Sequence, residues 1–258
     1  MQERRKLSEQ EEMTEIMKMI KTDYDAIADA YSRTRQVSEH VIAELQSFCS
    51  ITPESRVLEV GCGTAKHIHA LVDCTGCAGW GVEPSEGMRR HAPVHCRLNV
   101  CRGSGDCIPF EDGFFDLLFS VNVIHHLPSP RRYFEESIRV LRPGGRICTF
   151  TDSTEMIRRR EPLSRYWPMS AEADIARYPT VAALLEDMNQ AGYVNLTARK
   201  IKKTSLTAEA TPFRERAFSC LQLIDDIQFE KGLRLLEEDL QRGPVRMTSE
   251  YVCIWGEA

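Results

Sequence analysis

The sequence predicts an α/β fold in which helices cover both faces of a mainly parallel sheet. Apolar strand patterns and helical patterns alternate along residues 55–152, and this alternation is typical of repeated strand–helix–strand units. Gly61 and Gly63 directly follow the first strand, as expected where a ligand approaches the backbone of a strand-to-helix turn. The 258 residues, 42% of them apolar, can build one large domain with a substantial core.

The alternating elements can be placed in order. Strands are expected at residues 55–63, 77–85, 95–101, within 114–127 and, after a tight turn, within 142–152. Helices are expected at residues 65–73, 85–92 and 129–141, with Ser85 and Ser129 as N-caps and Pro130 at the first helical position. Right-handed crossovers place the carboxyl ends of all these strands at one edge of the sheet, so we expect the ligand there.

The segments on either side of this core follow other patterns. Residues 8–48 look helical, with Tyr24, Ile27, Tyr31 and Arg35 near one face. After Asp152, a polar and proline-broken stretch precedes further expected elements: helices at 181–192, 212–224 and 226–243, and strands at 193–201 and 251–258. We therefore predict one domain, residues 1–258, made of an N-terminal helical lid (1–50), a cofactor-binding core (51–152), a substrate-cover segment with C-terminal helices (153–250) and a last strand (251–258).

The composition argues against several kinds of partner. The formal net charge is -5 and the isoelectric point about 5.9, so the chain has no overall basic field and nucleic acid is not expected to bind. No apolar run approaches the roughly 18 residues of a membrane span, so no membrane partner is predicted. Residues 1–21 are charged and lack the apolar stretch of a secretion signal. We therefore expect a cytoplasmic protein.

The ten cysteines are expected to be reduced thiols, because the cytosol disfavours disulfides. Cys74 and Cys77 form the one C-x-x-C motif, and no second pair follows at zinc spacing, so no metal site is predicted. The motif is either a redox pair or, as we favour, two small thiols that are buried or half-buried.

The glycine loop indicates the chemistry of the ligand. A nicotinamide-binding loop has a third glycine where Lys66 stands, and no phosphate-binding G-x-x-x-x-G-K motif is present, so a nicotinamide oxidoreductase is the weaker interpretation. Glu59 places a negative charge just before the glycines, which suits a cationic ligand group. S-adenosylmethionine carries an ammonium group beside a carboxylate that helix N–H groups can bind.

Several stretches together resemble the class I S-adenosylmethionine-dependent methyltransferase family, in order and in spacing. They are "VLEVGCGT", "GVEPSEGM", "GSGDCIPFEDGFFDLLFS", "NVIHHL" and "VLRPGGRI". The N-terminal "YDAIADAY" is similar to the lid helix of the quinone-methyltransferase-like, type 11 branch. The resemblance covers residues 22–152 and implies a Rossmann-like, seven-stranded, mainly parallel sheet with an N-terminal lid helix and C-terminal helical additions.

The resemblance also implies roles for individual residues. Glu83 would accept both ribose hydroxyls, Met88 would pack on the adenine, and Gly105 would meet the adenine edge through its backbone. Ser104 stands where many relatives have the acid that meets the adenine amino group, and Asp106 is the alternative. The predicted S-adenosylmethionine-binding residues are Tyr24, Tyr31, Arg35, Glu59, Gly61, Cys62, Gly63, Glu83, Pro84, Met88, Gly105, Asp106, Asn122 and His125.

No catalytic residue is assigned, because displacement at an activated methyl group needs alignment more than acid–base help. His125 is either a general base or a packed side chain, whereas His126 is expected to pack or to cap the next turn. Arg158–Arg160 bind an anionic substrate or, more commonly for such runs, lie on a solvated helix face. Tyr166 and Trp167 line an aromatic pocket or fill the core.

These features predict an enzyme that transfers a methyl group from S-adenosylmethionine to a small-molecule acceptor by in-line displacement. The alternative is a catalytically silent S-adenosylmethionine-binding module that regulates or scaffolds a partner. Nucleic-acid amino-methyltransferases need a clamp such as N-P-P-Y after the fourth strand, where this chain has "NVIHH". Metal-assisted and thiol-dependent methylation are not favoured, since carboxylates are not clustered and several cysteines fall in predicted strands and helices.

Overall fold

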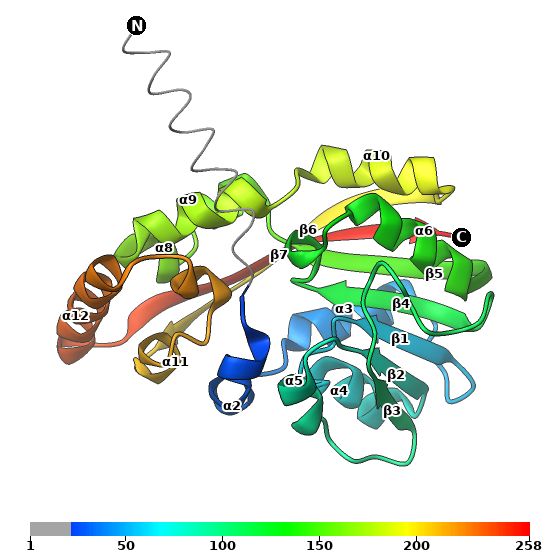
Figure 1. Ribbon diagram of the computed structural model, residues 1–258, viewed down its shortest axis with the longest axis horizontal. Helices are drawn as coiled ribbons and strands as arrows, with labels where there is room; N and C mark the ends of the chain where they lie inside the picture. Colours follow the sequence, from blue (N-terminus) through cyan, green and yellow to red (C-terminus); the bar gives the residue numbers. More distant parts are fainter. Residues whose placement is uncertain (1–21) are drawn as a thin grey trace, which may run out of the picture.

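The computed structural model describes residues 22–258. One seven-stranded sheet runs in the order β3-β2-β1-β4-β5-β7-β6 (Figure 1). Its strands are β1 (Arg56–Val60), β2 (Ala78–Val82), β3 (Leu98–Cys101), β4 (Phe115–Val121), β5 (Leu141–Thr151), β6 (Val194–Thr207) and β7 (Val245–Glu257). β1 to β5 pair in parallel, and β7 pairs antiparallel with both β5 and β6. The Rossmann-like, mainly parallel seven-stranded sheet is therefore confirmed.

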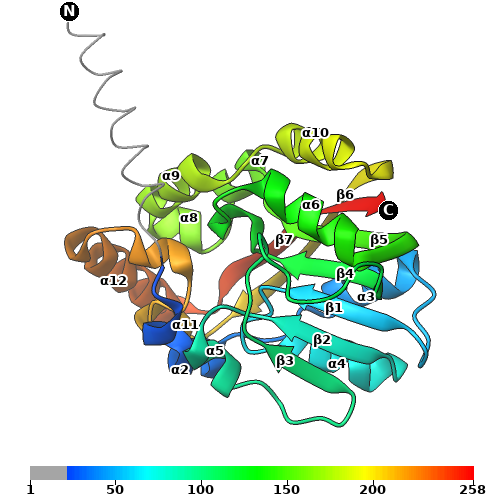
Figure 2. The same ribbon diagram turned by 45° about the vertical axis from the view of Figure 1, so that its right-hand side comes forward.

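Two helical layers cover this sheet (Figure 2). The helices are α6 (Pro130–Val140) and α10 (Val181–Ala191) on one face, and α3 (Glu39–Phe48) and α4 (Lys66–Thr75) on the other. Neighbouring strand residues alternate between the two cores, so Val57 packs under α4 while Leu58 packs under α6. This alternation follows from the two-residue period of a strand that is buried on both faces.

Local signals predicted the helix ends of the core well. The Ser85 hydroxyl accepts a hydrogen bond from the Met88 amide and begins α5 (Glu86–Arg90). Ser129 does the same for Arg132 at the start of α6. Gly192 ends α10 in the left-handed conformation, with φ of 104°.

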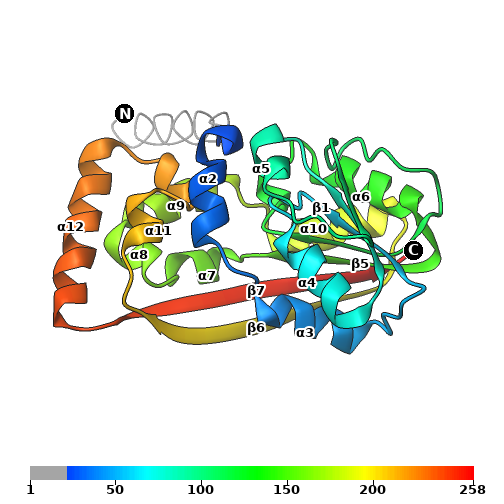
Figure 3. The same cartoon turned by 90° about the horizontal axis from the view of Figure 1, so that it is seen from below.

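A second cluster of helices lies beyond the carboxyl ends of the parallel strands. It contains α7 (Thr154–Arg158), α8 (Leu163–Tyr166), α9 (Pro168–Arg177), α11 (Thr211–Arg214), the 3-10 turn η2 (Ser219–Gln222) and α12 (Asp226–Arg242). β6 and β7 extend from the sheet to this cluster, and α2 (Tyr24–Thr34) lies between the cluster and the sheet (Figure 3). Trp167 is buried in the cluster's core and donates its indole N–H to the Phe229 carbonyl at 2.9 Å, and Tyr166 is buried beside it, so both fill the core.

Two expected helices differ from the structure. The long helix predicted over residues 8–48 is two helices, α2 and α3, because the chain is extended at Arg35 and at Ser38; its part before residue 22 lies outside the described residues. The helix expected at 212–224 is reduced to α11 and η2, since Arg216 adopts a left-handed φ of 46° that interrupts a helix.

Strand lengths in the second half were also underestimated. β6 and β7 pair along their whole length, from Val194 with Glu257 to Thr207 with Val245, so the last strand begins at residue 245 and not at 251. The predicted turn at "RPGG" is an irregularity at the start of β5, where the pairing with β4 shifts between Phe115 and Leu117. Among residues 22–258, no helix combines the length and apolarity needed to cross a membrane.

Candidate functional site

A cavity of about 860 Å³ opens where the parallel strands end, between the sheet, α2 and the second helical cluster. All of the predicted cofactor-binding residues line it: Tyr24, Tyr31, Arg35, Glu59, Gly61, Cys62, Gly63, Glu83, Pro84, Met88, Gly105, Asp106, Asn122 and His125. The cavity lies beside β1, which has β2 on one side and β4 on the other, and this reversal of strand order is where open α/β sheets bind ligands.

The glycine loop after β1 needs its glycines for two separate reasons. Gly61 and Gly63 have φ values of 67° and 55°, in the left-handed region that side chains disfavour. A Cβ atom on Gly61 would also lie 2.5 Å from Cγ2 of Val123, in the loop that follows β4. The loop is therefore held against the end of β4, and its backbone faces the cavity without obstruction.

Glu83 links the loops that follow β1 and β2. Its carboxylate accepts hydrogen bonds from the Gly63 and Ser85 amides, both at 2.9 Å. Burial raises the pKa of this carboxyl, and the two amide hydrogen bonds oppose that rise. The side chain is thus fixed at the cavity wall by backbone groups from two consecutive strand–loop units.

Glu59 lies deeper, beneath the first turn of α4. It accepts a hydrogen bond from the Ile68 amide at 3.0 Å, and burial raises its pKa well above the ordinary value. Its second oxygen lies 3.7 Å from Nδ1 of His67. Nε2 of His67 accepts the Ser38 amide, so the proton of the neutral ring is on Nδ1 and points toward Glu59. Burial lowers the pKa of His67 to about 4.

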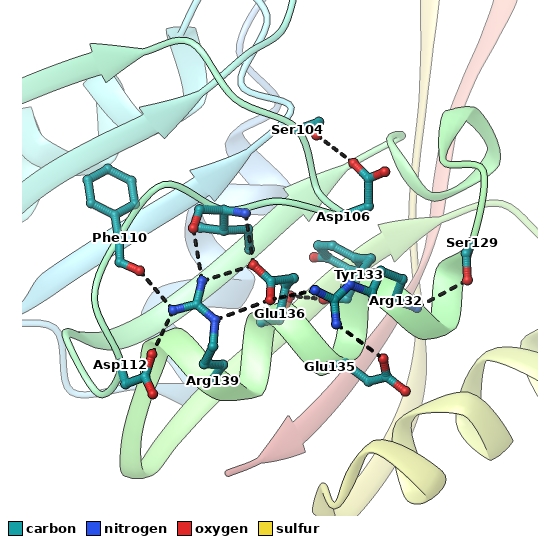
Figure 4. Close-up of polar contacts among 12 residues, drawn as sticks. Ser104, Asp106, Phe110, Asp112, Ser129, Arg132, Tyr133, Glu135, Glu136 and Arg139 are labelled. Carbon is teal, nitrogen blue, oxygen red and sulfur yellow. Dashed lines mark hydrogen bonds and ion pairs between the residues drawn. The ribbon is translucent and has the colours of Figure 1, made fainter.

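The loop from Gly103 to Asp112 forms the wall at the predicted adenine end. The Ser104 hydroxyl donates to the Asp106 carboxylate (Figure 4), so the two residues proposed as alternatives act as one unit in this structure. A Cβ on Gly105 would come within 3.0 Å of both Leu127 and Tyr133. Only a residue without a side chain fits there unless those neighbours shift.

Two side chains of α6 anchor the end of this loop (Figure 4). Glu136 accepts the Ile108 amide at 3.0 Å, and Arg139 donates to the carbonyls of Ile108 and Phe110, both at 2.9 Å. The two side chains also pair with each other at 2.9 Å, and their hydrogen bond lowers the pKa of Glu136. This clamp ties the loop to a helix that packs on the sheet, which makes it a rigid wall.

Helix α2 covers the cavity and is held at both ends. The Tyr24 hydroxyl and Nε2 of His126 are 2.7 Å apart, and Asp25 accepts hydrogen bonds from Ser85 and Gly87. At the other end, Nζ of Lys66 donates to the carbonyls of Ser32 and Arg35. Lys66, which stands where a nicotinamide-binding loop has its third glycine, therefore holds the end of helix α2 in place.

Arg35 is a cation without an acidic partner. Its guanidinium lies 5.6 Å from the ring centre of Tyr31 and 4.6 Å from that of Phe218. It forms no ion pair with any carboxylate in residues 22–258, although it lines the cavity. Aromatic faces stabilise such a cation while leaving its N–H groups available.

The two histidines after β4 behave differently from one another. His126 was expected to pack or to cap a turn, but it contacts the lid through Tyr24, and burial lowers its pKa to about 3. His125 is buried and stacks on Tyr178, with ring centres 3.8 Å apart. Burial lowers its pKa well below the ordinary value, and its Nδ1 has no hydrogen-bond partner among the described residues.

The wall opposite the glycine loop, here called the far wall, comes from the segment after β5 and from η2. It contains Arg160, Asp174, Arg177, Tyr178 and Ser219. The arginine run 158–160 is thus divided: Arg158 is exposed, Arg159 pairs with Glu155 and Glu250 on the surface, and Arg160 turns into the cavity.

Sequence reasoning missed several residues of the cavity, namely Lys66, His67, Asp174, Arg177, Tyr178 and Ser219. Asp174, Arg177 and Tyr178 lie in the proline-broken stretch without periodicity, and no short motif surrounds them. His67 carried one available signal, because it follows the glycine loop at the start of α4, where side chains of the first turn face the strand ends.

Thiol and metal chemistry find little support in the described part of the chain. All ten cysteines are free. In the C-x-x-C motif Cys77 is buried but Cys74 is exposed, so the favoured interpretation of two buried or half-buried thiols is only half right. Residues 22–258 contain no group of three or more His, Cys, Asp or Glu side chains placed to hold a metal ion.

The donor set of the cavity suits a nucleoside with a charged amino-acid tail. One fixed carboxylate, Glu83, can meet a ribose diol, and the glycine loop leaves room for a ligand against its backbone. Arg35 offers an unpaired cation, and Oδ1 of Asn122 is a buried acceptor without a partner in the described residues. The fold and cavity together define a Rossmann-like protein that binds a nucleoside cofactor.

Comparisons with known proteins identify the family. Residues 58–149 match the family model described as "Methyltransferase domain". An uncharacterized methyltransferase of Mycolicibacterium gilvum is 44% identical over 92 residues, which is 34% of this chain and 36% of that protein. A mouse protein named as a candidate tRNA methyltransferase 9B is 34% identical over 113 residues, 42% of this chain and 24% of that protein.

Structural comparison agrees on the fold. A protein of Anabaena variabilis, named as a candidate methyltransferase from an antibiotic biosynthesis pathway, superposes with a TM-score of 0.71 at 21% identity, covering 86% of this chain and 98% of that one. Residues 58–149 are thus similar to the class I S-adenosylmethionine-dependent methyltransferase family, and the fold of the chain agrees with that family. Its cofactor is S-adenosylmethionine. The matched region spans well under two thirds of the two curated relatives named above.

Proposed function

We propose that this protein transfers the methyl group of S-adenosylmethionine to a small-molecule acceptor. The observation that carries the proposal is that one cavity joins two unlike walls beneath α2. The glycine loop and Glu83 form a wall suited to the cofactor, and the far wall, with Arg160, Arg177 and Tyr178, forms another. We further propose that residues 1–258 act as one domain with the lid, core, cover and last-strand segments defined above.

The cofactor roles follow from the chemistry of each group. Glu83 would accept the two ribose hydroxyls, because amides of Gly63 and Ser85 already hold its carboxylate in place. The Ser104–Asp106 pair and Met88 would meet the adenine. Arg35 would bind the carboxylate of the methionine part, for which it has an unpaired charge. Bound S-adenosylmethionine supplies a methyl group that its positive sulfur already activates.

The chain's own contribution would be alignment and exclusion of water, which can lower a barrier by roughly 7–11 kcal/mol. The contacts of Tyr24, Asp25 and Lys66 hold α2 over the cavity and so restrict water. His125 is the candidate for accepting a proton from an acceptor that must lose one. It is neutral near pH 7, because burial lowers its pKa, and its Nδ1 has no partner in the described residues.

A small acceptor is supported by the size and cover of the cavity. A volume of about 860 Å³ must hold both cofactor and acceptor, and pockets for small ligands generally fall within roughly 300–1,000 Å³. The net charge of -5 also disfavours a nucleic-acid backbone. Since one relative is named for tRNA, tRNA is the rival acceptor that the experiment must include.

The test combines calorimetry with product analysis. We expect S-adenosylmethionine to bind the wild type, and Glu83→Gln to weaken binding about 30-fold or more, because a buried charged acceptor is lost. Glu86→Gln, on the exposed face of α5, is the matched control and should bind normally.

Formation of S-adenosylhomocysteine with fractions of a metabolite extract, but not with tRNA, would support the proposal. Normal binding without turnover on any acceptor would instead favour the silent binding module. Failure of the wild type to bind S-adenosylmethionine would refute both.

A further inference from the structure

We propose that the acceptor carries an oxyanion, a carboxylate or a phosphate, which the guanidinium groups of Arg177 and Arg160 bind at the far wall. The inference rests on the proposed function, since it names the class of acceptor for the same cavity. It follows from the hydrogen-bonding capacity and the charge that the far wall leaves unused.

The guanidinium of Arg177 is fixed by hydrogen bonds and still has N–H groups that are not used. Only 6% of its side chain is exposed. Nε and Nη2 donate to Oδ1 of Asp174 at 2.9 and 2.6 Å, and Nη2 also donates to the Ser219 hydroxyl at 2.8 Å. Nη1 forms no hydrogen bond within residues 22–258. Its two N–H groups therefore remain available in a planar fork whose position is already set.

Arg160 adds a second positive charge to the far wall. Its Nη1 donates to Asp152 at 3.2 Å, and its Nη2 donates to Oδ2 of Asp174 at 2.5 Å and to Sγ of Cys220 at 3.7 Å. Its Nε is buried and finds no partner in the part of the chain that the structure describes. Because this atom has almost no accessible surface, Arg160 attracts an oxyanion in the cavity by its charge and not through Nε.

The acceptors of the far wall are already engaged. Oδ1 of Asp174 accepts from Arg177 and Oδ2 accepts from Arg160, so both oxygens of the one carboxylate in the far wall are in use. The unused capacity of the two arginines consists of N–H donors. A ligand that completes them must bring oxygen acceptors, and charge-assisted bonds to a carboxylate or a phosphate are the strongest that a guanidinium forms.

The charges at the cavity surface agree with this assignment. Arg160, Arg177 and Asp174 line the cavity, whereas Asp152 lies behind Arg160 and does not. The surface that a ligand meets at the far wall therefore carries two cations and one anion. A cationic acceptor would be repelled by both arginines, and an oxyanion would bring the wall close to neutrality.

The same geometry orients the acceptor. Tyr178 follows Arg177 directly, and its ring stacks on His125. An oxyanion on Arg177 would thus place the rest of a short acceptor near the stacked Tyr178 and His125, in the cavity that the glycine loop also lines. The far wall would hold one end of the acceptor while its nucleophilic atom points toward the cofactor.

The experiment titrates simple probes into the protein saturated with S-adenosylhomocysteine. We expect benzoate or phenyl phosphate to bind at least 10-fold more tightly than uncharged benzamide, and the tighter of the two anions identifies the carboxylate or the phosphate. Arg177→Gln should abolish that preference while S-adenosylhomocysteine affinity stays within about 2-fold. Arg159→Gln, a surface arginine of the same run, is the control and should retain the preference.

A measurement on the wild type tests the proposal even if the Arg177→Gln variant does not fold. The guanidinium 15N signals of Arg177 and Arg160 should shift with the preferred anion and not with benzamide. Normal S-adenosylhomocysteine binding with equal affinity for all three probes would overturn the oxyanion assignment and leave the proposed function standing. If the wild type does not bind S-adenosylhomocysteine, both the oxyanion assignment and the proposed function are overturned.

Discussion

The near wall and the far wall of the cavity are built in opposite ways. The near wall is made by Gly61, Gly63 and Glu83, which lie within two consecutive strand–loop units and are joined by backbone amides. The far wall brings together Arg160, Arg177 and Ser219 from separate elements, joined by paired side chains. Backbone contacts depend on loop conformation, whereas buried side-chain pairs depend on charge balance. We therefore expect substitutions in the near wall to act through loop conformation, and substitutions in the far wall to act through unbalanced buried charge.

The largest effect is expected at the far wall. Asp174→Ala should lower the free energy of unfolding by about 3–5 kcal/mol, because it leaves the buried charge of Arg177 without its carboxylate and leaves Arg160 with Asp152 alone. Urea unfolding measures this. Glu237→Gln, whose partner is the exposed Arg214, should cost less than about 1 kcal/mol. Equal losses in the two variants would show that the far-wall network is no more important than a surface pair.

The near wall should be most sensitive at Gly61. Gly61→Ala combines a left-handed φ with a Cβ placed 2.5 Å from Val123, and we expect about 3 kcal/mol of destabilisation. Gly63→Ala is the matched control. It shares the left-handed φ, but its Cβ would meet nothing closer than 3.8 Å, so only about 1–2 kcal/mol should be lost. Urea unfolding that ranks Gly63→Ala as the more damaging variant would contradict the packing argument.

Acid should lower the stability of the protein through His126, which contacts α2. Its pKa is about 3 in the folded protein, against an ordinary value of 6.5, so between these values the unfolded chain binds more protons. Stability should therefore fall as the pH falls below 6.5, by up to about 1.4 kcal/mol per pH unit for this residue. His126→Asn should reduce the slope of the pH dependence between pH 6 and 5, and His67 and His125, whose pKa values are also lowered, should account for what remains. An unaltered slope in His126→Asn would contradict this account.

The smallest effect concerns the lid. Tyr24→Phe removes the hydroxyl bound to His126, and we expect a loss of about 1 kcal/mol in unfolding free energy and a few-fold weaker cofactor binding. Tyr193→Phe is the control, because the Tyr193 hydroxyl is buried without a partner in the described residues and its removal should cost nothing. If Tyr193→Phe loses more unfolding free energy than Tyr24→Phe, the Tyr24–His126 contact does not hold the lid.

Prediction from sequence succeeded where the signal was local. The caps of α5 and α6, the buried strands of the parallel core and the glycine loop each depend on residues within a few positions of one another. It failed at residues 212–224, where Arg216 adopts a left-handed conformation and Phe213 and Phe218 stack in the core. Tertiary packing there overrides a helical pattern.

The amino-acid sequence alone determined the alternating fold, the edge of the sheet where the cavity opens, and the acid and glycines that line it. Periodicity, capping and the φ preference of glycine act over a few residues, so they can be read directly. Only the tertiary structure decided that Lys66 fastens the lid, that His126 meets Tyr24, and that Arg160 and Arg177 share Asp174. These contacts link residues from different elements, and their energy comes from shared burial and charge pairing, which no short stretch of sequence encodes.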